Sequence, residues 1–119
     1  EARMLARAAL DGMLANDRLD AIVSPSNGPA SIVDPVNGGN YFGSPSTLPA
    51  VSGYPHLTVP SGEASGVPLG ISFLGPAWSE AKLLALGFAF EQATHARREP
   101  EFLPNVGARP EIGKAYDPR

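Results

Sequence analysis

The chain has 119 residues, 43% of them hydrophobic, which is enough for one domain with a modest core. Twelve acidic and nine basic residues give a net charge of −3, which argues against nucleic acid or a membrane surface as a partner. The lack of cysteine excludes disulfides and thiolate metal sites, and no apolar run approaches the roughly 18 residues of a membrane span. We expect a cytoplasmic protein, although composition leaves a periplasmic location open.

Strong helix-forming residues predict a first helix from position 1 to about position 16. Arg3, Arg7 and Asp11 are spaced by four residues on one face, which we expect to be solvated. The apolar residues line another face: Leu5, Ala9 and Met13. Because Glu1 already lies within the helical pattern, we expect a chain cut from a longer polypeptide.

Residues 20–24, DAIVS, predict a short buried strand, since an apolar triplet between chain-breaking residues has no polar face for water. A long loop rich in Pro, Gly and Asn follows over residues 25–46. Such loops are often functional, and this one leaves a strand end, where α/β proteins tend to bind ligands.

A short helix capped by Ser46 or Thr47 is predicted to end at Ser52, before Gly53. Residues 56–59 then predict a strand stopped by Pro60, with a turn over 61–68 and a second strand over 69–74, together an antiparallel hairpin. His56 lacks an acidic residue spaced to orient it. We interpret it as structural or exposed, with a role in a site as the alternative.

A second long helix is predicted to start at Ser79, its cap, and to run to about Arg98. Its apolar stripe consists of Leu83, Leu86, Phe90 and Ala93, widened by Leu84 and Phe88. A helix apolar on two sides is expected between a sheet and a second neighbour. We expect Trp78 to pack as a hydrophobic staple, and residues 99–119 to form an irregular tail.

These elements predict an α/β fold in which two main helices and one short helix pack on about three strands, as part of a larger mixed sheet. The order of short motifs also matches a known family. The motifs are LPAVSG at 48–53, YP at 54–55, LTVP at 57–60 and PLGISFLG at 68–75. In order and spacing, the sequence resembles the C-terminal segment of amidase signature enzymes, most closely the branch with the peptide amidases.

The resemblance implies hydrolysis of a small-molecule carboxamide to a carboxylate and ammonia, without a cofactor. Family members use a Lys and two Ser residues, the Ser residues lying in a Gly/Ser-rich segment upstream. This sequence lacks that segment, and its only lysines are Lys82 and Lys114. A serine nucleophile needs a positioned base, so we expect no catalytic residue here and no activity without the N-terminal part of the same enzyme. The S-x-x-K match of Ser79 and Lys82 lacks its companion motifs and is interpreted as a coincidence.

By the same resemblance, the loop after the first strand lies at the mouth of the substrate pocket. The substrate-binding candidates are Asn27, Gly28, Asn40, Tyr41, Phe42, Gly43 and Ser44. Amide and hydroxyl groups could hold a polar substrate group, and Phe42 could wall an apolar one. For Asn27 and Gly28, the alternative is a turn that needs positive φ.

A different interpretation is a self-contained, non-catalytic binding or structural domain. The two interpretations differ in what surrounds the sheet. A segment cut from a larger sheet should leave an exposed apolar patch or an unpaired edge, which a second copy of the chain can cover as a homo-oligomer.

Overall fold

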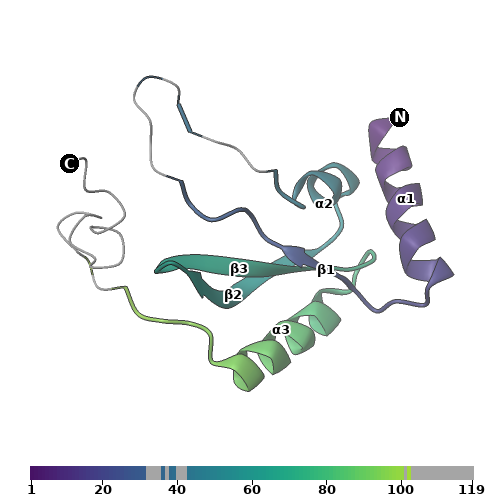
Figure 1. The fold of residues 1–119 in the computed structure, drawn as a ribbon. Helices are drawn as coiled ribbons and strands as arrows, with labels where there is room; N and C mark the ends of the chain where they lie inside the picture. The colour runs from purple at the N-terminus through teal and green to yellow at the C-terminus, as the bar shows by residue number, and fades with distance from the viewer. Residues whose placement is uncertain (32–35, 37, 40–42, 101, 103–119) are drawn as a thin grey trace.

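The computed structural model of the chain describes residues 1–31, 36, 38–39, 43–100 and 102. Its elements, in chain order, are α1 (Ala2–Asn16), β1 (Ile22–Pro25), α2 (Thr47–Ser52), β2 (His56–Ala64), β3 (Val67–Leu74) and α3 (Glu80–Thr94). The predicted α/β arrangement of three strands, two main helices and one short helix is confirmed. α3 lies along the sheet, and α1 lies beside α2 (Figure 1). No helix in this part of the chain is long and apolar enough to cross a membrane.

The sheet has the strand order β1-β3-β2, and both pairings are antiparallel. The pairing aligns Ser24 of β1, Ser72 of β3 and Thr58 of β2 in one row across the sheet. The predicted antiparallel hairpin is therefore confirmed, and β1 joins it at the free edge of β3.

The hairpin turn is tighter than predicted, because β2 continues through Pro60 as far as Ala64. Ala64 pairs with Val67, so only Ser65 and Gly66 form the turn. Their φ angles of 50° and 74° suit the turn type that matches the twist of a two-residue hairpin. Pro60 is tolerated because β2 is an edge strand of the described sheet and its pairing with β3 is irregular between Pro60 and Gly62.

The core lies between α3 and one face of the sheet. Its buried residues are Val59, Phe73 and Leu83, packed by Leu57, Ile71, Leu86 and Phe90. The rings of Phe73 and Phe90 meet edge to face, with centroids 6.0 Å apart. Gly87 permits the close approach of α3 to β2, since a Cβ there would lie 2.6 Å from Leu57 Cδ2.

The outer side of α3 has no cover among the described residues. Leu84 is 61% exposed and Phe88 is 65% exposed, so the second neighbour expected for this helix is not supplied here. The helix ends at Thr94, earlier than predicted, because His95 adopts a left-handed φ of 46°. Ser79 does not cap it through its side chain, since its Oγ donates a hydrogen bond to the carbonyl of Pro76 instead.

Three further expectations are wrong. Trp78 does not pack as a staple: it is 91% exposed, on backbone with a φ of 63°. β1 is not fully buried, because its residues alternate in exposure and Val23 is 52% exposed. In α1 the buried side is one position away from the expected stripe and consists of Ala6, Leu10 and Leu14.

We predict that the two neighbouring leucines of α3 differ sharply in their contribution to stability. Leu83→Ala should lower the free energy of unfolding by about 2–5 kcal/mol, because it leaves a cavity beneath the helix. Leu84→Ala removes the same atoms from the exposed side and should cost no more than about 0.5 kcal/mol. Urea denaturation followed by circular dichroism measures both. Equal losses would mean that α3 does not pack on the sheet by this face.

Candidate functional site

A hollow of about 260 Å³ lies where the chain leaves β1. It is lined from β1 and the segment after it by Val23, Ser24, Pro25 and Asn27, from β2 by Ser61, and from β3 by Leu69, Gly70 and Ile71. The Ser26 N–H donates to the carbonyl of Gly70 at 2.9 Å, which extends the β1–β3 ladder beyond Pro25. The sheet therefore fixes the position of the backbone next to Asn27.

Three hydroxyl groups hold the exit of β1 against the sheet, and we call them the hydroxyl cluster: Ser26, Thr58 and Ser72. The Oγ atoms of Ser26 and Ser72 are 2.7 Å apart, and Thr58 Oγ1 lies 2.9 Å from Ser72 Oγ. Ser26 Oγ also donates to Thr58 Oγ1 at 3.4 Å. Gly70 leaves room for this arrangement, because a Cβ there would lie 2.9 Å from Ser26 Oγ. This cluster was not predicted from the sequence, although serines at alternating positions 24 and 26 mark one face of an extended chain.

Two pairs of the predicted site residues are brought to the same region. Ser44 Oγ donates a hydrogen bond to the carbonyl of Ser26 at 3.2 Å, so Gly43 and Ser44 lie close to the segment that carries Asn27 and Gly28. Gly43 has a φ of 83°, a backbone conformation that favours glycine. The other candidates, Asn40, Tyr41 and Phe42, lie outside the described residues.

Asn27 serves a local turn and also keeps a free donor. The N–H of Gly28 donates to Asn27 Oδ1 at 3.0 Å, which is a local turn interaction. Neither residue has a positive φ, so the positive-φ turn considered as the alternative for Asn27 and Gly28 does not form. Within the described part of the chain, the Asn27 side-chain NH₂ donates no hydrogen bond. Asn27 is exposed at the rim of the hollow, where this group can meet a ligand.

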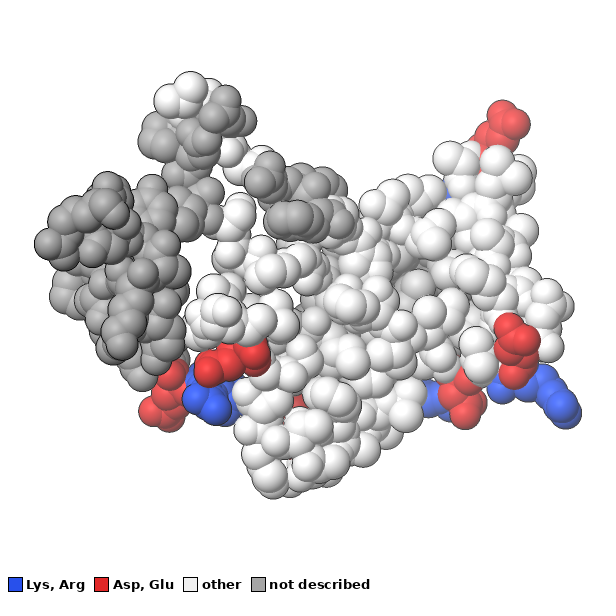
Figure 2. Space-filling model, viewed as in Figure 1, with Lys and Arg blue, Asp and Glu red and all other residues white. Residues whose placement is uncertain are grey.

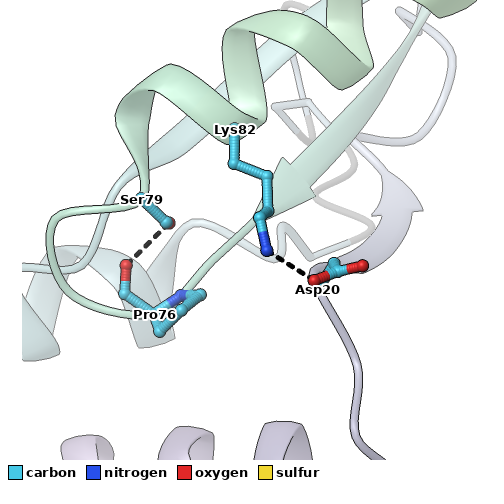
Figure 3. Close-up of polar contacts among 4 residues, drawn as sticks. All are labelled: Asp20, Pro76, Ser79 and Lys82. Carbon is cyan, nitrogen blue, oxygen red and sulfur yellow. Dashed lines mark hydrogen bonds and ion pairs between the residues drawn. The ribbon is translucent and has the colours of Figure 1, made fainter.

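The S-x-x-K residues do not meet one another. Ser79 Oγ donates to the carbonyl of Pro76 at 2.7 Å, whereas Lys82 Nζ forms an ion pair with Asp20 Oδ1 at 2.5 Å (Figure 3). His56 Nε2 is enclosed and has no hydrogen-bond partner in the part of the chain that the structure describes. In that same part, no group of three or more His, Asp or Glu residues is placed to hold a metal ion.

The charged face of α1 is exposed, as expected, but its side chains also form hydrogen bonds to the region around α2. Arg7 Nε donates to the carbonyl of Ser52 at 2.9 Å, and the Tyr54 hydroxyl donates to both carboxylate oxygens of Asp11, at 2.8 and 2.9 Å. These contacts tie α1 to the end of α2. The hydrogen bond to Asp11 is the main cause of a raised pKa for Tyr54, since the anionic carboxylate favours the protonated phenol.

The chain is similar to known proteins over most of its length, although no protein-family profile matches it. A probable amidase from Arabidopsis thaliana is 37% identical over 100 residues, which cover 83% of this chain and 16% of that protein. The crystal structure of a peptide amidase from Stenotrophomonas maltophilia is 44% identical, with a TM-score of 0.74 over 85% of this chain and 20% of the peptide amidase.

A bacterial aryl acylamidase of the amidase signature family matches with 26% identity and a TM-score of 0.54, over 77% of this chain and 22% of that one. The chain therefore spans about a sixth to a fifth of the length of the proteins that it matches. The resemblance predicted from the short motifs is confirmed, both in sequence and in fold.

We predict that Tyr54 titrates above the ordinary tyrosine pKa of about 10. Because the folded-state pKa is raised, the Tyr54–Asp11 bond stabilises the fold fully below about pH 10, and this contribution is lost as the pH rises through the higher folded-state value. The absorbance of the phenolate should show this as a late titration step that Tyr54→Phe removes. Asp11→Asn should move the step to lower pH. If the step that Tyr54→Phe removes lay at or below pH 10, the assignment would be contradicted.

Proposed function

The chain is homologous to one segment of the amidase signature enzymes, and we propose that it forms scaffold and one wall of the substrate pocket in an enzyme that hydrolyses a carboxamide to a carboxylate and ammonia. The observation that carries the proposal is the position of the hollow at the end of β1. It lies within a fold shared with a peptide amidase, where the chain leaves the sheet at Asn27.

The groups around this hollow suit an amide substrate. Asn27 offers a free side-chain NH₂ that can donate to a carbonyl oxygen, and Ser44 lies nearby on the returning loop. Val23, Leu69 and Ile71 provide apolar walls for the acyl part of a substrate. Gly28 and Gly43 remain predicted members of this site, as do Asn40, Tyr41 and Phe42, which lie outside the described residues.

The chemistry itself is assigned to polypeptide outside this chain. Each oxygen of the hydroxyl cluster is hydrogen-bonded to another hydroxyl of the cluster, and among the described residues none of the three is hydrogen-bonded to a basic side chain. Lys82 is paired with Asp20, and His56 has no acidic partner in the described residues. A serine without a base remains a weak nucleophile, so we propose that the N-terminal part of the same enzyme supplies both groups.

The alternative of a self-contained binding or structural domain is less well supported. Two large apolar side chains remain exposed on the outer side of α3: Leu84 and Phe88. In the view of Figure 2, charged side chains lie mainly along the lower margin and much of the face is uncharged. Exposed apolar side chains of this kind mark contacts with further protein, and we propose that the remainder of the enzyme covers them.

We predict that the 119-residue chain releases no ammonia from peptide amides above the buffer background, because no base is paired with a nucleophile among its described residues. The full-length enzyme should release ammonia from the same substrates. A coupled ammonia assay compares the two at equal molar concentration. Measurable turnover by the short chain would contradict the proposal that it is inactive alone.

We also predict that Asn27→Ala in the full-length enzyme lowers kcat/KM about fivefold, since it removes one hydrogen bond worth about 1 kcal/mol. Asn16→Ala is the matched control. Asn16 is exposed at the end of α1 and does not line the hollow, so its replacement should leave kcat/KM unchanged. Equal effects of the two substitutions would remove Asn27 from the pocket wall.

A further inference from the structure

A second hollow lies between α1, the segment after α2 and the turn before α3, and it shares no lining residue with the hollow at Asn27. Its volume is about 300 Å³. Arg3 and Arg7 line it from α1, Tyr54 lines it after α2, and Trp78 and Glu80 line it at the start of α3. We call it the arginine pocket.

Both guanidinium groups keep most of their donors free. Arg7 Nε donates to the carbonyl of Ser52 at 2.9 Å, and Arg3 Nε donates to the same oxygen at 3.4 Å. These bonds use only the Nε atoms. Among the described residues, neither arginine forms an ion pair or a hydrogen bond through its terminal nitrogens. The terminal NH₂ groups are the part of the guanidinium fork that binds a carboxylate with two parallel hydrogen bonds.

The two arginines are held in place before any ligand arrives. Ser52 is fully buried at the end of α2, so its carbonyl is a fixed anchor. Gly53 lies directly beneath Arg3, because a Cβ at this position would be 3.0 Å from Arg3 Nη2. A role limited to capping α2 would need one donor, which Arg7 already supplies. The second arginine and the free NH₂ groups therefore exceed what the helix end requires.

Aromatic rings form the walls of the arginine pocket. The Arg7 guanidinium carbon lies 5.7 Å from the centre of the Tyr54 ring, whose hydroxyl is fixed by Asp11. Trp78, which is 91% exposed, is also among the residues that line this hollow. Glu80 contributes a negative charge to the lining, so the charged lining residues sum to one positive charge. An anion with a flat apolar body fits such a lining better than a bare inorganic anion.

We propose that the arginine pocket binds a small organic anion in which a carboxylate is attached to a flat ring. The carboxylate meets the terminal nitrogens of Arg3 and Arg7, and the ring lies against Tyr54 and Trp78. This binding does not depend on the proposed amidase function, because it uses none of the groups around the hollow at Asn27.

The chain contains its own reporter, since Trp78 is its only tryptophan. Titration of the 119-residue chain with benzoate should give a saturable change in tryptophan fluorescence. Benzyl alcohol has the same ring without the charge and should give none. Arg3→Ala should weaken benzoate binding about tenfold, as expected for the loss of a charge-assisted hydrogen bond. Arg97→Ala removes an exposed arginine outside the pocket and should leave benzoate binding unchanged.

Arg3→Lys tests the planar geometry of the Arg3 guanidinium separately from its positive charge. It also covers the case in which Arg3→Ala weakens binding only because it destabilises α1. It keeps the positive charge but cannot bind a carboxylate with two parallel hydrogen bonds, so weaker binding with an unchanged far-ultraviolet spectrum supports the proposal. Two results would overturn it. One is a fluorescence response that does not saturate with benzoate, and the other is an affinity that Arg3→Ala and Arg3→Lys leave unaltered.

Discussion

Because β3 hydrogen-bonds to β1 on one side and to β2 on the other, the alternation of its side chains decides what each face of the sheet contains. Phe73 points to α3 and enters the core, whereas its neighbour Ser72 joins the hydroxyl cluster on the opposite face. One strand thus builds the apolar core and positions the exit of β1 beside Asn27. A shift of register by one residue would exchange the two faces and remove both features.

The core is one-sided. α3 covers a single face of the sheet and approaches β2 closely at Gly87, but its own outer side keeps Leu84 and Phe88 in water. An independent domain of this size would be expected to cover side chains of this kind. The exposed outer side of α3 and the match to only 16–20% of related proteins both agree with our proposal that further protein packs on this chain.

The sequence predicted the elements well where the signal was local. Periodicity, Gly53 and the turn-forming residues of 61–68 were enough to predict three helices and a hairpin, and the short motifs pointed to the correct family. Pro60 misled the prediction, because its effect on a strand depends on whether that strand lies at an edge. The ties of Arg7 to Ser52 and of Tyr54 to Asp11 could not be predicted, since they join residues more than 40 positions apart. In the candidate site, the structure brings Asn27 and Ser44 close together through Ser26. The hydroxyl cluster could not be predicted, since its members are 14 to 46 positions apart and the alternation of Ser24 and Ser26 marks only a shared face of the extended chain.

The route by which the sheet is completed has a kinetic consequence. β2 and β3 are joined by two residues, so they can pair progressively from their turn. β1 pairs with β3 only when Ser24 reaches Ser72, and this contact closes a loop formed by the whole intervening chain. Strand pairing with β1 therefore carries the larger loss of chain entropy and is expected to form after the hairpin. The region around Asn27 then takes shape only in the closing stage of folding, when the ladder between β1 and β3 has formed.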